Sequence, residues 1–117
     1  MAEEGQVISV HTLESWKEQL QRAKDSNKLV VVDFAASWCA PCRFIAPILA
    51  EIAKLKPEVI FLKVDVDELR SVVKEWFIES IPTFLFLKDE KLVDKVVGAK
   101  KEAQKVTIEK HSSAIDC

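Results

Sequence analysis

The chain has 117 residues, enough for one buried core but not two. We therefore expect a single domain over residues 1–117, with an ordered core of about 7–111 and short tails. With 49% hydrophobic and 31% charged residues, the composition excludes a disordered chain. The net charge of −2, with lysines and glutamates interspersed, gives no electrostatic case for nucleic acid or an anionic membrane as partner.

The amino terminus, residues 1–6, is acidic and lacks the basic start and apolar run of a signal peptide. No apolar stretch approaches the roughly 20 residues that a membrane span needs. A cytoplasmic protein is the expectation. Because cytosolic thiols are kept reduced, a Cys-x-x-Cys pair among the three cysteines indicates redox chemistry or metal binding rather than a structural disulfide.

The first elements alternate between strand and helix. The apolar run Val7–Val10 predicts a strand, and Thr12 is a plausible cap for the helix that follows. Apolar residues recur there at helical spacing, at Leu13, Trp16 and Leu20. The β-branched run Leu29–Ala36 predicts a strand covered on both faces.

A helix over Pro41–Leu55 follows, in which Pro47 predicts a kink. The run Val59–Val64 predicts another buried strand. The next helix has an apolar stripe of Leu69, Val72, Val73 and Trp76, and we expect Trp16 and Trp76 to be core residues.

The apolar runs Thr83–Leu87 and Leu92–Val97 predict an antiparallel hairpin, joined by the charged connection Lys88–Lys91 and ended by Gly98. The segment Lys100–His111 predicts a last helix. Its apolar residues, Ala103, Val106 and Ile108, share no clean face. This alternation of elements predicts an α/β layer structure.

Cys39 and Cys42 lie where a buried strand gives way to a helix. We expect Cys39 at the exposed helix N-terminus, where unpaired backbone N–H groups and the helix dipole favour its thiolate. Cys42 falls about one turn later on the same face, within reach of a disulfide. Pro41 suits the first turn, since its missing N–H would be unpaired there.

The alternative for the cysteine pair is half of a zinc site, which needs two further ligands. Besides carboxylates, the available donors are His11, His111 and Cys117, and none has the paired spacing of a second half-site. Redox chemistry is therefore the favoured interpretation, and no metal site is expected.

Several segments together resemble the thioredoxin family. Trp38–Cys42 follows a strand that ends in Val32–Phe34, and the segments Phe61–Asp65, Ile81–Thr83 and Val97–Ala99 come after it. The resemblance extends from about Val7 to about His111. The amino-terminal Met-Ala-Glu-Glu-Gly-Gln and the segment Phe61–Leu69 are similar to plant h-type cytosolic thioredoxins in particular.

This resemblance implies a thioredoxin fold, with a central five-stranded mixed β-sheet flanked by four α-helices. It implies a protein-disulfide reductase that serves cell redox homeostasis, in which Cys39 is the nucleophile and Cys42 the resolving thiol. No cofactor is expected on the chain itself. Electrons would come from NADPH through a flavin-containing thioredoxin reductase, or from a glutathione-linked reductant, and pass from a monomer to disulfide-containing target proteins.

Asp33 interrupts a run of valines, so burial would raise the pKa of its carboxyl group. It is a candidate proton acceptor for Cys42. Alternatively it reaches the surface or simply pairs with Lys63, the matching interruption in the next strand. The resemblance favours the proton-transfer role, assisted by Lys63.

In the family the proline at position 82 is cis and packs against the cysteines, so we expect a cis Ile81–Pro82 bond although trans is the general rule. Ile81 would then present its backbone to an extended target segment. The implied apolar docking surface comprises Trp38, Ala40, Pro41, Ile81, Pro82, Val97, Gly98 and Ala99.

The chain departs from the family pattern in two places. Ala40 stands where many thioredoxins have glycine, and we expect a modest retuning of the redox potential. Cys117 has no counterpart in the pattern and is expected to be an unremarkable terminal thiol. Two other classes of protein stay open: a non-enzymatic module that binds partners through this fold, and a metal-binding domain.

Overall fold

The computed structural model describes residues 5–112; the terminal thiol of Cys117 lies outside them. The elements are β1 (Val7–Val10), α1 (Leu13–Asp25), β2 (Val30–Ala35), α2 (Ala40–Leu55), β3 (Ile60–Asp65), α3 (Arg70–Glu75), β4 (Thr83–Lys88), β5 (Lys91–Val97) and α4 (Lys101–Ser112). The predicted order of strands and helices is confirmed. Where predicted and observed ends differ, the difference is one residue.

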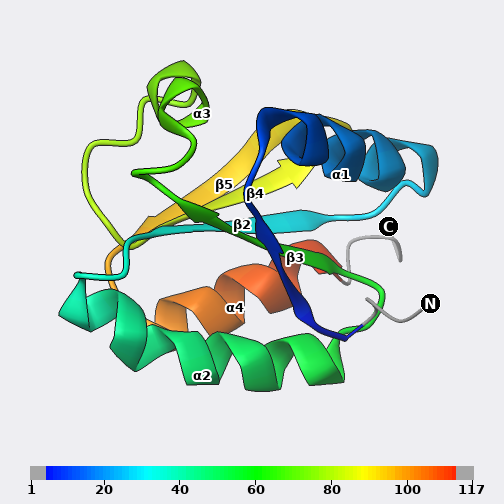
Figure 1. Cartoon of the computed structure of the whole chain (residues 1–117). Coiled ribbons are helices and arrows are strands. Elements are labelled where there is room, and N and C mark those ends of the chain that lie inside the picture. Colours follow the sequence, from blue (N-terminus) through cyan, green and yellow to red (C-terminus); the bar gives the residue numbers. More distant parts are fainter. Residues whose placement is uncertain (1–4, 113–117) are drawn as a thin grey trace.

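Within the described residues the strands form one five-stranded sheet in the order β1-β3-β2-β4-β5. The strands β1, β3 and β2 are parallel, and β4 and β5 are antiparallel to their neighbours. Helices α1 and α3 cover one face, and α2 and α4 cover the other (Figure 1). The expected five-stranded mixed sheet with four flanking helices is confirmed.

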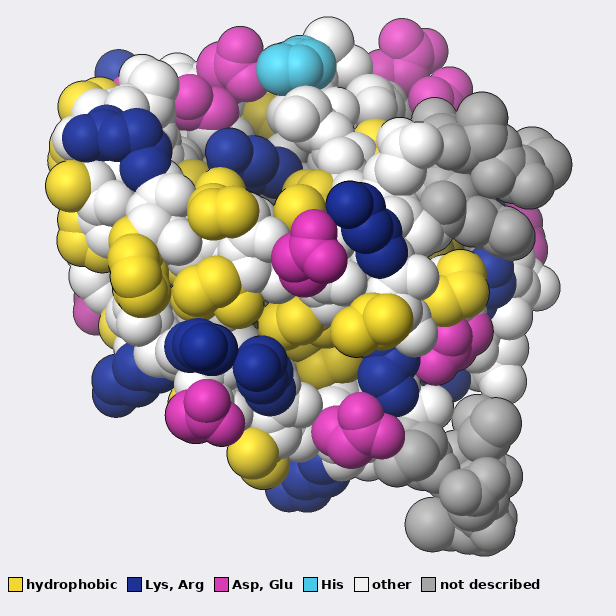
Figure 2. All heavy atoms as spheres, turned by 90° about the horizontal axis from the view of Figure 1, so that it is seen from below, with side chains coloured by type: hydrophobic (Ala, Val, Ile, Leu, Met, Phe, Trp, Pro, Cys, Tyr) yellow, Lys and Arg dark blue, Asp and Glu magenta, His cyan; other side chains and the backbone are white. Residues whose placement is uncertain are grey.

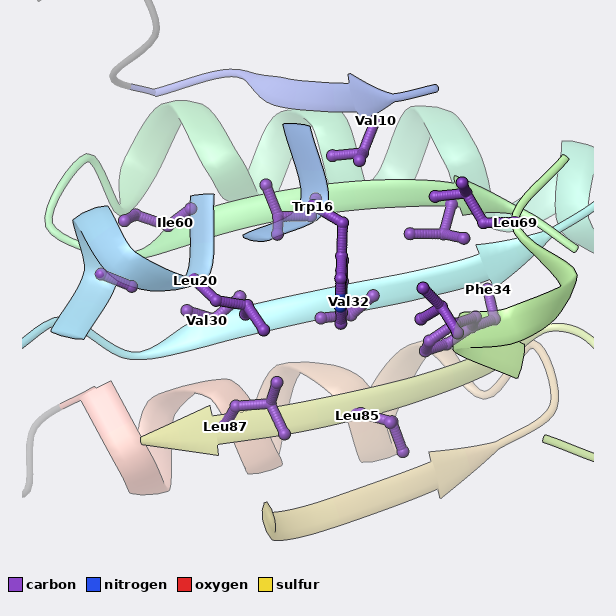
Figure 3. Close-up of a cluster of buried hydrophobic side chains, with 14 residues drawn as sticks. Val10, Trp16, Leu20, Val30, Val32, Phe34, Ile60, Leu69, Leu85 and Leu87 are labelled. Atoms are coloured by element: carbon purple, nitrogen blue, oxygen red, sulfur yellow. The ribbon is translucent and has the colours of Figure 1, made fainter. Parts of the chain in front are cut away.

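The core on the α1 side is built around Trp16 (Figure 3). Trp16 and Leu20 of α1 pack over alternate residues of β2, which are Val30, Val32 and Phe34. The prediction for Trp16 is thus confirmed. Trp76, just after α3, is half-buried and packs against the edge of the same cluster.

The core on the opposite face joins α2 and α4 to the sheet. Ile45, Leu49 and Ala53 of α2 share it with Ile108 of α4. The sequence showed no clean apolar face on α4 because the buried face of this helix is partly polar. Gln104, one turn before Ile108, is fully buried, whereas Val106 is exposed to solvent. The Gln104 side chain donates a hydrogen bond to the Gly98 carbonyl at 3.2 Å, which ties α4 to the end of β5.

The hairpin of β4 and β5 turns tightly through Asp89 and Glu90, since Lys88 pairs directly with Lys91. Both turn residues are left-handed, with φ of 55° and 63°, as a type I′ turn requires. At the other end of β5, Gly98 has a φ of 98° and its N–H donates to the Pro82 carbonyl at 2.8 Å. This bond holds the end of β5 against the start of β4.

Lysines, arginines and acidic residues alternate over the face formed by α2 and α4, with apolar groups between them (Figure 2). The picture agrees with the mixed charge pattern of the sequence. None of the helices in residues 5–112 is long and apolar enough to cross a membrane.

Candidate active site

Cys39 and Cys42 form a disulfide at the junction of β2 and α2, with their Cα atoms 5.3 Å apart. Cys39 is the N-cap of α2 and has an extended backbone. Its Sγ accepts a hydrogen bond from the backbone N–H of Cys42 at 3.2 Å. In the reduced protein the same N–H and the positive end of α2 favour the thiolate form of Cys39.

The expectation that Cys39 is exposed is wrong. Only 5% of this residue is accessible, against 4% of Cys42. The two cysteines form a small apolar cluster, called here the cysteine cluster, with Ala35 and Ala36. Ile81, from a loop distant in sequence, packs against it and helps to cover the helix tip. The cysteines therefore differ in their place on the helix, not in their exposure.

Asp33 lies on β2 and is buried, so the idea that it reaches the surface is wrong. Its Oδ1 has no hydrogen-bond partner among the described residues. Burial raises the pKa of the carboxyl group from 3.8 to about 7, while the charge of Lys63 acts in the opposite direction. Desolvation dominates because a buried carboxylate loses its hydration.

Lys63 pairs with Asp33 in the register of β2 and β3. Both residues line a cavity of about 210 Å³ beneath α2. A neighbouring cleft of about 480 Å³ is lined by Cys42 and again by Lys63. Ser9 and Ala46 also line both hollows. Asp33 and Cys42 thus border adjoining spaces with shared walls, each large enough for water.

The Ile81–Pro82 peptide bond is cis, as predicted. Pro82 itself is buried, while Ile81 is half-buried. No backbone hydrogen bond joins Ile81 to any other residue in the range 5–112. Its backbone groups are therefore available for strand-like pairing beside the disulfide.

Trp38 projects from the loop before the disulfide and is 66% exposed. Its indole N–H donates to Oδ2 of Asp67 at 2.9 Å, and Asp67 is fixed in turn by a bond from its own N–H to Asp65 at 2.8 Å. On the other side of the loop, the Arg43 guanidinium donates to the Ser37 carbonyl at 2.8 Å. The indole is therefore held in place while its faces stay open to solvent.

Sequence analysis missed Asp67 and Arg43. A signal for Asp67 was present, because Trp38 follows β2 and Asp67 follows β3. These strands are parallel neighbours, so their carboxyl ends meet at one edge of the sheet. Nothing in the sequence pointed to the contact between Arg43 and the Ser37 carbonyl.

Residues 5–112 contain no group of three or more histidine, cysteine, aspartate or glutamate side chains placed to hold a metal ion. His11 instead contacts Glu68 at 3.0 Å, and His111 contacts Asp94 at 2.9 Å. The hydrogen bond from His111 is the main reason that the pKa of Asp94 is lowered.

Comparison with known proteins agrees with the fold and the disulfide. The family model described as Thioredoxin matches residues 7–110. A thioredoxin H-type from Ricinus communis is 66% identical over 110 residues, covering 94% of this chain and 93% of the relative. The chain belongs to the thioredoxin family. Thioredoxin H1 from Arabidopsis thaliana is 63% identical over 110 residues, covering 94% and 96% of the two chains.

A solved thioredoxin has nearly the same backbone. The crystal structure of thioredoxin NaTrxh from Nicotiana alata matches with a TM-score of 0.89 and 42% identity, covering 97% of this chain and 98% of that one. As a thioredoxin with plant h-type relatives, the protein is a disulfide oxidoreductase that acts by thiol–disulfide exchange. The adjacent Cys39–Cys42 pair is the centre that fits this chemistry.

The residues expected from the thioredoxin resemblance to dock targets differ in exposure. Trp38, Ala40, Pro41 and Val97 are exposed, and Ile81, Gly98 and Ala99 are half-buried. Pro82 is buried and contributes by its carbonyl bond to Gly98 rather than by accessible surface. A Cβ on Gly98 would meet no backbone atom nearby, and its φ of 98° is what favours glycine there.

Proposed function

We propose that this protein is a general protein-disulfide reductase of the cytoplasm, with Cys39 as the nucleophile and Cys42 as the resolving thiol. The observation that supports it most is the pair's position: the disulfide closes the first turn of α2, with the Sγ of Cys39 on a helix N–H. A single domain carries this activity, since the family match spans residues 7–110.

The reaction proceeds in two exchanges. The Cys39 thiolate attacks one sulfur of the target disulfide, forms a mixed disulfide and releases the other target sulfur as a thiolate. Cys42 then loses its proton and attacks the Sγ of Cys39, which breaks the mixed disulfide and releases the second target sulfur. The target gains two electrons and two protons, and the Cys39–Cys42 disulfide forms.

Asp33 is the proposed acceptor of the Cys42 proton. A carboxyl group with a pKa of about 7 is matched to proton transfer at neutral pH. The adjoining hollows beside Cys42 and Asp33 leave room for a water to relay the proton. Lys63, on the wall of both, assists by moderating the pKa of Asp33.

Targets dock on the apolar surface around the cysteine cluster. Trp38 offers an open indole, and the backbone of Ile81 pairs with an extended target segment. The remaining members of this surface are Ala40, Pro41, Pro82, Val97, Gly98 and Ala99. Because Cys39 is mostly covered, such docking brings the target sulfur to its small accessible part.

The electrons come from NADPH through a flavin-containing thioredoxin reductase, or from a glutathione-linked reductant, and the chain acts as a monomer. A disulfide reductase needs a compartment in which its own disulfide is reduced again to the dithiol. This requirement supports the cytoplasm, where thiols are kept reduced, as the location of the protein.

The proposal is tested by insulin reduction with dithiothreitol as electron donor, for the parent, Cys39→Ser and Cys42→Ser. The parent is expected to accelerate precipitation of the reduced insulin chains. Cys39→Ser is expected to be inactive, whereas pre-reduced Cys42→Ser, mixed with insulin after removal of dithiothreitol, is expected to accumulate a mixed disulfide. Activity that survives Cys39→Ser would show that this cysteine is not the nucleophile.

A further inference from the structure

Phe77 combines two features that are unfavourable for a large apolar side chain. Its φ is 55°, in the left-handed region that bulky residues rarely adopt. The residue is 79% exposed, so burial of its ring does not compensate for the backbone strain. The other non-glycine residues with positive φ in the described chain are all polar: Asn27, Asp89 and Glu90.

The turn at Phe77 is fixed by the end of α3. The N–H of Phe77 donates to the Lys74 carbonyl at 3.2 Å, and that of Ile78 to the Val73 carbonyl at 3.0 Å. This is the Schellman pattern, in which glycine usually takes the place of Phe77. Because Trp76 and Ile78 pack inward against the core, the backbone of Phe77 is held between them and its ring is presented to solvent.

The same segment leads to the disulfide. Ile81 is four residues beyond Phe77 and packs against the cysteine cluster, so the two Cα atoms are at most about 14 Å apart. The chain after α3 descends to the end of the sheet at which α2 begins (Figure 1). On the other side of the disulfide, Trp38 directly precedes Cys39. Trp38 and Phe77 thus place exposed aromatic rings on the two segments that border the disulfide, and a third exposed ring, that of Phe44, lies on α2 two residues after Cys42.

We propose that Phe77 is a docking residue for protein substrates, which binds an apolar side chain of the target near the cysteine that Cys39 attacks. The inference rests on the proposed function, since it needs a target engaged at Cys39. A target strand that pairs with Ile81 and runs toward α3 would advance by about 3.3 Å per residue, so an apolar residue within about four positions of the target cysteine would span the distance to Phe77. Aromatic rings suit this role because they supply a large contact area.

Strain at this turn then has a reason, because strained backbone persists where it serves a site. Glycine or asparagine would fit the left-handed turn with less strain but would remove the ring. Docking and stability therefore make opposite demands on position 77.

The test compares Phe77→Gly and Phe77→Asn with the parent. Single-turnover rate constants are measured for the pre-reduced proteins with insulin and with 5,5′-dithiobis(2-nitrobenzoate), a disulfide too small to span to Phe77. Both variants are expected to lose about five-fold on insulin, to keep the parent's rate on the small disulfide, and to melt about 2–6 °C higher. Phe77→Trp is expected to retain both rates.

Leu55→Asn is the matched control, because Leu55 is also 79% exposed but ends α2 on the side away from the disulfide. It is expected to change neither rate. Equal insulin rates in the parent and both ring-free variants would overturn the docking role and leave the proposed function standing. Equal losses on both substrates would also overturn it, since the effect would then lie in the dithiol. A parent that reduces neither disulfide would overturn the proposed function itself.

Discussion

Asp33 lies directly opposite Lys63 in the parallel pair of β2 and β3, yet the pKa of its carboxyl group is raised to about 7. Proximity to a cation would lower this pKa, so loss of hydration outweighs the attraction. The balance places the charge change of Asp33 near neutral pH. Both the exchange reaction and the stability of the fold should therefore depend on pH in this range.

Replacing Asp33 by asparagine keeps the shape of the side chain and removes its titration. We expect release of the mixed disulfide by Cys42 to slow about 100-fold near neutral pH, because general base catalysis is lost. The first attack by Cys39 should barely change. Rapid-quench trapping of the mixed disulfide with a peptide substrate separates the two steps. If both steps keep the parent's rates, Asp33 is not the proton acceptor.

The same substitution should alter stability in a pH-dependent way. The pKa of Asp33 rises from 3.8 to about 7 on folding, so its stabilising contribution is complete below about pH 4 and is lost as the pH rises through 7. The full loss is about 4 kcal/mol. Asp33→Asn should match the parent near pH 4 and exceed its stability near pH 8.

Urea unfolding of the oxidised parent and Asp33→Asn proteins at several pH values between about 4 and 8 measures this difference. Glu51→Gln is the control, since that carboxylate is exposed on α2 and pairs with Lys54 in the same helix. A stability difference between Asp33→Asn and the parent that stays constant with pH would contradict the raised pKa.

Lys63→Met tests the other half of the pair. The ammonium group lowers the pKa of Asp33 against the effect of burial, so its removal should raise that pKa above about 7. Carbon-13 NMR titration of the Asp33 carboxyl group measures the shift directly. Lys95→Met, in the exposed part of β5, should leave the titration unchanged. An unchanged pKa in Lys63→Met would remove the assisting role of Lys63.

The hairpin turn should be open to stabilisation. Asp89 and Glu90 both hold left-handed backbones, which glycine adopts freely and glutamate does not. Glu90→Gly should therefore raise the free energy of unfolding by about 1 kcal/mol. Urea unfolding measures it, with Lys91→Gly as a control that should lower stability because Lys91 lies in β5. A loss of stability in Glu90→Gly would show that the turn imposes no strain.

The elements could be predicted because each follows from local pattern. The valine-rich run of β2 could only be a buried strand, and the cysteine pair followed it at a helix start. The predictions that were wrong concern properties that depend on contacts between segments distant in sequence. Cys39 was expected to be open, but the loop with Ile81 covers it, and no property of residues 38–42 alone could show that.

The burial of Gln104 was not predicted, for a related reason. A polar residue in a helix is expected at the surface, so the stripe of α4 was not recognised. The side-chain N–H of Gln104 donates to the Gly98 carbonyl, a bond that exists only once β5 and α4 are docked, while its Oε1 has no hydrogen-bond partner among the described residues. Polar groups whose partners come from tertiary structure escape analysis by hydrophobic periodicity.

Substitution of Ala40 tests how a residue between the two cysteines affects the redox potential of the disulfide. It is the first residue of α2 and is exposed, so its methyl group acts through backbone freedom rather than packing. Such freedom is worth about 0.4–1 kcal/mol, which corresponds to roughly 10–20 mV for a two-electron couple. Ala40→Gly should shift the redox potential by about this amount, measured by equilibration in glutathione buffers. Ala50→Gly, later in α2, should not shift it. A shift above roughly 60 mV in Ala40→Gly would show that Ala40 acts on the disulfide by more than backbone freedom.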